Sequence, residues 1–152
     1  MHARAQIRNA LAAALATLPG APRLYVGANY PIDSHLELPA VCLYTRGESV
    51  DLAGSTMGAP VVVRDLEVEI VGVLAADDTD DLADELAEAI EAAVGLAIEA
   101  GGALGGLVRW SGELTTAISG YTETDRAIRL VTVGLTLNYR TPAWSPAQLL
   151  TI

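Results

Sequence analysis

The side chains that could carry nucleophilic or acid–base chemistry are few and lie far apart in the sequence. A nucleophile needs a base within hydrogen-bond reach, and usually a third group that orients this base. The two histidines are His2, near the start of the chain, and His35, which follows Ser34 in a loop. Neighbouring residues of an extended loop point to different sides. We therefore interpret His35 as a solvated loop histidine and not as the base of a catalytic pair.

The single cysteine, Cys42, stands between Val41 and Leu43 in a strand-like segment. A reactive thiolate needs positive neighbours or the N-terminus of a helix, and the surrounding sequence provides neither. One cysteine cannot form an internal disulfide, and it makes a zinc site improbable beside two separated histidines. The pattern predicts a buried cysteine with a structural role.

Two further motifs could bind ions or cofactors. Asp77–Asp81 is rich in carboxylates, but it lacks the central glycine and the distal glutamate of an EF-hand, and capping of a following helix explains the same residues. The glycine pairs at 101–102 and 105–106 follow a helix instead of opening one, and the chain contains no lysine, so they do not predict a phosphate loop. We expect no metal, no cofactor and no enzymatic activity. A small α+β enzyme or ligand-binding domain is the alternative of another class.

Length and charge narrow the choice further. The chain of 152 residues fits a single domain, and its formal net charge is −10. An acidic chain without a basic cluster is a poor candidate for wrapping nucleic acid or for binding an anionic membrane surface. No stretch approaches the roughly 20 apolar residues that a membrane span needs. The composition favours a domain that works through contacts with other proteins.

The apolar residues recur with helical spacing in two segments. A helix is predicted over Ala3–Leu18, and one face of it consists of Ile7, Leu11 and Leu15. Pro19 and the glycine after it end this helix. The second helix begins at the aspartates 77–81, carries its apolar residues on one face and its acids largely on the other, and ends at the glycines from 101.

Period-two alternation predicts the strands. Leu66, Val68 and Ile70 alternate with acidic residues, which gives one apolar and one acidic face. The expected strands are Arg23–Val26, Ala40–Thr45, Val61–Leu74, Leu107–Trp110, Glu113–Ser119 and Ala127–Tyr139. The glycines and small polar residues of segment 47–60 indicate a mobile loop or a wide hairpin. The fold class is α+β: a mainly antiparallel sheet of about four to five strands with two amphipathic helices on one face. The domain covers residues 1–141, and residues 142–152 form an extended tail.

We therefore expect the functional residues to be surface residues that contact identical subunits. A symmetric ring could pair acids on one strand face with arginines at strand ends. These residues are Glu67, Glu69, Arg46, Arg64, Arg109, Arg126 and Arg129. The tail adds Trp144, Leu149 and Leu150, which are too apolar for a free end; the tail either folds back on its own domain or docks on an adjacent subunit.

The order of these segments resembles that of phage tail terminator proteins of the minor tail protein U type. The helix ARAQIRNALAAALATLPG is followed by LPAVCLYTRGE, which is similar to the LPAV-plus-strand segment of that family. The strand RDLEVEIVGVLA, the helix DDTDDLADELAEAIEAAV and the segment WSGELTTAISGYTETDRAIRLVTVGLTLNY follow in the family's order. The resemblance covers the chain from Ala3 to Tyr139.

The resemblance implies a virion protein that forms a ring, typically a hexamer, on the head-proximal end of the tail tube. Such a ring stops tube polymerisation and presents the surface to which the head docks. Its partners would be further copies of the chain, the tail tube protein and a neck or head-completion protein, while DNA passes through its lumen. The same layout would place the segment Glu48–Pro60, including Asp51, at ring or tube contacts. A neck, head-completion or tail-completion protein of the same interface is the alternative.

Overall fold

The computed structural model of the chain describes residues 1–27, 37–53, 60–75, 80–123 and 126–152. Its elements are α1 (Ala3–Leu15), β1 (Arg23–Val26), β2 (Ala40–Leu52), β3 (Val61–Ala75), α2 (Asp80–Ile98), β4 (Val108–Trp110), β5 (Thr115–Glu123) and β6 (Arg126–Pro142). The predicted α+β class is confirmed, with a six-stranded sheet in place of the four to five strands expected. Within the described residues, no helix is long and apolar enough to cross a membrane.

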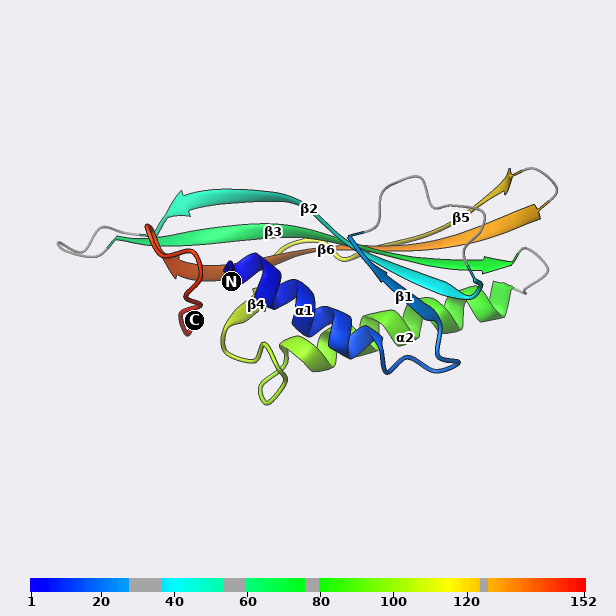
Figure 1. Cartoon of the computed structure of the whole chain (residues 1–152), viewed down its shortest axis with the longest axis horizontal. Coiled ribbons are helices and arrows are strands. Elements are labelled where there is room, and N and C mark those ends of the chain that lie inside the picture. Colours follow the sequence, from blue (N-terminus) through cyan, green and yellow to red (C-terminus); the bar gives the residue numbers. More distant parts are fainter. Residues whose placement is uncertain (28–36, 54–59, 76–79, 124–125) are drawn as a thin grey trace.

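The sheet has the order β1-β2-β3-β6-β4, and β5 also pairs with β6 (Figure 1). All these pairs are antiparallel except β1–β2, which is parallel. β4 pairs with β6 around Leu137–Tyr139, and β5 pairs with the earlier part of β6, from Arg126 to Gly134. β4 and β5 therefore lie end to end along one edge of the sheet. This edge is called the β4–β5 edge below.

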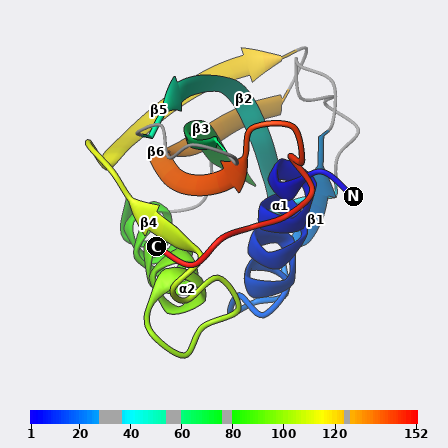
Figure 2. The same ribbon diagram turned by 90° about the vertical axis from the view of Figure 1, so that its left-hand side faces the viewer.

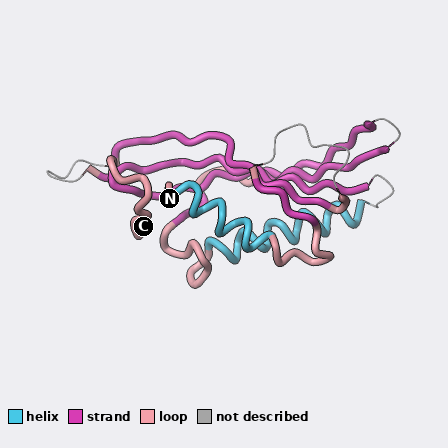
Figure 3. The backbone as a smooth tube through the Cα atoms, viewed as in Figure 1, coloured by secondary structure: helices cyan, strands magenta, loops and turns pink. Residues whose placement is uncertain are grey.

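Both helices cover the same face of the sheet (Figures 1 and 3). α1 buries Ile7, Leu11 and Leu15, one residue per turn, against this face, and α2 buries a matching row of mostly small side chains. The close packing explains Gly72 in β3, because a Cβ there would lie only 2.5 Å from a methyl carbon of Leu86. The predicted arrangement of two amphipathic helices on one face is confirmed.

Several elements differ in length from the sequence prediction; β5 runs from Thr115 to Glu123 and β6 from Arg126 to Pro142. β2 continues past Thr45 to Leu52, through a bulge between Thr45 and Glu48, where the sequence indicated a loop or wide hairpin from residue 47. The long partner strand β3 supplies backbone hydrogen bonds that local propensity does not reveal. α1 ends at Leu15 instead of Leu18, because the amide of Thr17 bonds to the carbonyl of Ala14, in the tighter pattern of a 3₁₀ turn.

The tail folds back on its own domain. The amide of Ala3 donates to the carbonyl of Pro146 at 2.7 Å, and the amide of Ile152 donates to the carbonyl of Gly106 at 2.9 Å. Leu150 forms an isolated bridge with Arg140 in β6. Figure 2 shows the tail crossing this end of the molecule towards β4. These contacts hold the tail against its own domain.

Candidate functional site

A buried polar cluster lies on the helix-facing side of the sheet, where β2, β3 and β6 meet. Arg64 Nη1 donates to Glu48 Oε2 at 2.8 Å, and the two side chains are only 10% and 9% exposed. Arg64 Nε donates to Thr141 Oγ1 at 3.0 Å, and the Tyr139 hydroxyl donates to the second oxygen of Glu48. Burial, followed by this bond to Glu48, raises the pKa of Tyr139 well above its usual value. Glu48 and Arg64, expected at ring contacts, are thus paired with each other inside the chain.

The outer face of the sheet, opposite the helices, is polar over the half that contains Glu67 and Glu69. Arg46 Nη2 lies 2.6 Å from Glu69 Oε1, and its guanidinium lies 4.4 Å from the centre of the Tyr44 ring. Glu67 is exposed beside this pair, and Asp51 is exposed further along β2. The predicted alternation in β3 therefore places the acids outward. Arg46 and Glu69 already partner each other within one chain, which leaves Glu67 as the more accessible acid.

The other half of the outer face is apolar, which the sequence reasoning missed. Its buried core consists of Ala40, Cys42, Tyr44, Val71, Val73 and Ile128. Cys42 is buried, as predicted, and burial raises the pKa of its thiol. A signal was present, because the alternation of β3 stops after Ile70 and the segment IVGVLA is apolar on both faces.

A small apolar hollow lies between α2 and the β4–β5 edge. Its volume is about 140 Å³. The lining residues are Glu91, Val94, Gly95, Ile98, Trp110, Leu114, Val133 and Leu135. Trp110 and Leu114 remain 54% and 45% exposed at its mouth. Arg109, one of the predicted interface residues, is exposed next to Trp110 on β4. Arg109 was predicted as an interface residue from the sequence, whereas Trp110 was not. A tryptophan at a strand end is nevertheless a strong sign of a contact surface.

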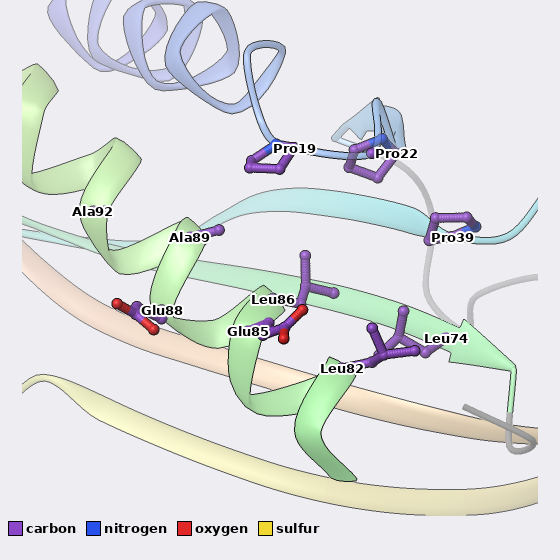
Figure 4. Close-up of a pocket in the computed structure, with 11 residues that line it drawn as sticks. Pro19, Pro22, Pro39, Leu74, Leu82, Glu85, Leu86, Glu88, Ala89 and Ala92 are labelled. Atoms are coloured by element: carbon purple, nitrogen blue, oxygen red, sulfur yellow. The ribbon is translucent and has the colours of Figure 1, made fainter. Parts of the chain in front are cut away.

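A second hollow is a groove of about 620 Å³ between α2 and the turns that follow α1 (Figure 4). Pro19, Pro22 and Pro39 lie on one side of it. Leu82 and Leu86 of α2 lie on the other side, so the lining is mostly apolar. Among the described residues of the lining, Glu85 and Glu88 of α2 carry charge.

The remaining predicted residues serve different purposes. Arg129 forms an ion pair with Asp80 and so ties β6 to the first turn of α2. Leu149 packs against the main core, and Leu150 is half-buried, whereas Trp144 is 91% exposed. Arg126 begins β6, but its side chain lies outside the described residues, as do His35 and Asp77–Thr79. His2 has a local structural role: its Nδ1 accepts the amide hydrogen of Arg4 at 3.1 Å and caps α1.

The described residues present several surfaces that can contact other proteins. In the part of the chain that the structure describes, no group of three or more histidine, cysteine, aspartate or glutamate side chains is placed to share a metal ion. What the site can do chemically is form protein contacts: a polar outer face, an edge strand with apolar neighbours, and an exposed tryptophan. Neither the models of known protein families nor the curated proteins give a match to this chain.

Proposed function

We propose that the protein is a structural subunit of a long-tailed phage, a tail terminator whose copies form a ring on the head-proximal end of the tail tube. In this role it ends tube polymerisation and presents the surface that joins the head. The proposal draws on the order of segments described above. It is supported by a fold in which helix, strands, helix and strands follow one another in that order, with both helices on one face of the sheet.

The observation that carries the proposal is the β4–β5 edge. Every residue of β5 from Thr115 to Gly120 is exposed, and Thr116 alone among them donates a side-chain hydrogen bond to α2, from Oγ1 to Glu91 Oε1. In the described part of the chain, no further strand pairs with this edge. Soluble proteins usually protect such an edge, because its free backbone groups and apolar side chains invite pairing with another chain. In an assembly, a neighbouring subunit can cover such an edge, so the subunit needs no protection of its own.

The charge of the molecule suits a ring that DNA passes through. The formal net charge is −10, and Asp51, Asp65 and Glu67 all lie on the polar half of the outer face. If this half lines the lumen, the carboxylates repel DNA phosphate over the Debye length of about 8 Å at physiological salt. The genome would then move through the ring without binding to it.

The test is the effect of the purified protein on tube assembly. Light scattering after size-exclusion chromatography and negative-stain images should show rings with the diameter of the tail tube. Addition to polymerising tube protein should give tubes capped at one end, and a phage that lacks the gene should make tails of uncontrolled length. Tails of normal length in that phage would contradict the terminator role. Binding to the portal side of the joint in place of the tube would favour a neck protein.

A further inference from the structure

We infer that Trp144 of one copy docks in the hollow between α2 and the β4–β5 edge of the next copy, and that this contact joins the subunits. The inference rests on the proposed ring and names the surfaces that form it. The occupant is a second copy of this chain. Four observations lead to it: the tryptophan, the hollow, their separation and their charges.

Trp144 is exposed although its backbone is held firmly. The residue before it, Ala143, donates its amide to the carbonyl of Pro60 at 2.8 Å, and the one after it, Ser145, donates to Pro142 at 3.1 Å. The side chain nevertheless remains 91% exposed. A tryptophan buries a large apolar area when it finds a pocket. Because the backbone on both sides of it is already held, docking has to order only the side chain, which limits the entropic cost of binding.

The hollow has the size and lining that an aromatic ring needs. Its volume of about 140 Å³ is close to that of an engineered cavity of about 150 Å³ that binds benzene in another protein. The lining is apolar except for Glu91. Gly95 leaves it open on the α2 side, since no heavy atom lies within 4 Å of the place where its Cβ would be. Trp110 at the mouth offers a second ring for an edge-to-face contact.

The tryptophan cannot fill the hollow of its own chain. Trp144 follows the end of β6 at Pro142, beside the start of β3, whereas Val133 and Leu135 of β6 line the hollow. At about 3.3 Å per residue, these positions are separated by roughly 25 Å along the strand. The hollow also opens beside the β4–β5 edge, on the other side of β6 from β3. Two different surfaces that fit each other make a head-to-tail contact, which closes into a ring or continues as a filament.

Each of the two surfaces carries groups that can pair with a charge on the other. The side that carries Trp144 has Arg4 and Arg8 on α1 and Arg140 at the end of β6, and the sequence of α1 contains no acid. Among the described residues, no ion pair engages these three arginines. Around the hollow, Glu91 belongs to the lining and Glu113 is exposed next to Leu114, while Arg109 is exposed next to Trp110. The other acids of α2 lie nearer its N-terminus, where Asp80 pairs with Arg129 and Glu85 and Glu88 line the other groove. Pairing of these arginines with Glu91 and Glu113 of the next copy steers the two surfaces together and fixes their register.

Two variants test the contact from its two sides. Trp144→Ala removes the anchor, and Gly95→Leu fills the hollow. We expect each to weaken self-association by about 30-fold or more, as the loss of a central anchor does. Both changes leave the fold intact, because Trp144 is exposed and leucine is a better helix former than glycine. Val26→Ala, at an exposed position in β1, is the matched control and should assemble like the wild-type chain.

A mixing experiment identifies the contact as head-to-tail. Trp144→Ala retains the hollow and Gly95→Leu retains the tryptophan, so a mixture has one working joint and should give a 1:1 heterodimer in native mass spectrometry. Rings of unchanged stability from Trp144→Ala would overturn the inference and leave the proposed function standing. Association through Trp144 that gives no tube-capping ring would support the inference and contradict the function. A wild-type chain that stays monomeric at all concentrations would overturn both.

Discussion

At the scale of single residues, the most consequential group is the buried ion pair of Glu48 and Arg64. A buried ion pair stabilises a fold only if both charged groups are also well hydrogen-bonded. Here Thr141 accepts a hydrogen bond from Arg64, and Tyr139 donates one to Glu48. The pair fastens β2 to β3 beside β6, at the end of the sheet near the tail. It is therefore a structural element of the surface that carries Trp144.

The first prediction concerns this pair. Glu48→Ala leaves the guanidinium of Arg64 buried without its counter-charge, and we expect it to lower the free energy of unfolding by about 3–5 kcal/mol. The control is Glu69→Ala, which breaks the more exposed pair with Arg46 and leaves the Arg46 guanidinium over the Tyr44 ring; the side chains of Arg46 and Glu69 are 40% and 31% exposed. That loss should stay below about 1 kcal/mol. Urea denaturation measures both, and equal effects would show that burial does not distinguish the two pairs.

The second prediction concerns alkaline pH. Burial raises the pKa of Tyr139 and of Tyr44 above the value of about 10 for free tyrosine. Below pH 10 both hydroxyls are neutral in the folded and unfolded chains. Above it only the unfolded chain releases these protons readily, so stability should decline as the pH rises past about 10. In Tyr139→Phe, the free energy of unfolding should fall less steeply with pH. Urea denaturation at several pH values measures this slope. An unchanged slope would contradict the raised pKa of Tyr139.

The inward position of Glu48 could not be predicted from the sequence. Simple alternation from Cys42 and Tyr44 places Glu48 on the outer face of the sheet. The bulge between Thr45 and Glu48 shifts the register by one residue and turns Glu48 towards the helices. Gly47 offers a hint of the bulge, but sequence spacing alone does not show which face the following residues occupy.

At the scale of elements, regular periodicity made the helices and the long strands predictable. The alternation of Leu66, Val68 and Ile70 predicted a strand and its buried face. The four-residue spacing of Ile7, Leu11 and Leu15 did the same for the first helix. The extension of β2 to Leu52 and the parallel position of β1 depend on distant pairing partners. Nothing in their local residues specifies such partners. For the same reason, the hollow beside Trp110 could not be foreseen.

The third prediction tests how α2 packs on β3. Gly72→Val adds atoms where a Cβ would already lie 2.5 Å from a methyl of Leu86. We expect a loss of about 1–3 kcal/mol in the free energy of unfolding, the usual cost of overpacking. Leu86→Ala in the same chain should recover part of this loss, because it vacates the space that valine needs. A double-mutant cycle measures the coupling. Strictly additive effects would contradict the contact.

At the scale of the whole molecule, the two faces of the sheet differ in their covering and in their chemical character. The helices seal one face, while the outer face is apolar in one half and acidic in the other. The two sides of the molecule also differ in charge, with arginines near the tail and carboxylates along α2. A chain with this asymmetry can contact identical neighbours through its sides and keep the acidic half of the outer face free for a lumen.

The fourth prediction concerns that lumen. Glu67 is exposed on the outer face, and its reversal in every subunit would place a circle of positive charges along the path of the DNA. Glu67→Lys should therefore leave ring formation unchanged and slow DNA release from the virion several-fold at low salt. The delay should shrink as salt is raised, because phosphate contacts are strongly salt-dependent. Glu67→Gln, which only neutralises the carboxylate, should fall between the wild type and Glu67→Lys in timed DNA-release assays. If all three release DNA at the same rate, this half of the face does not line the channel, and the lumen must be formed by a different surface of the subunit.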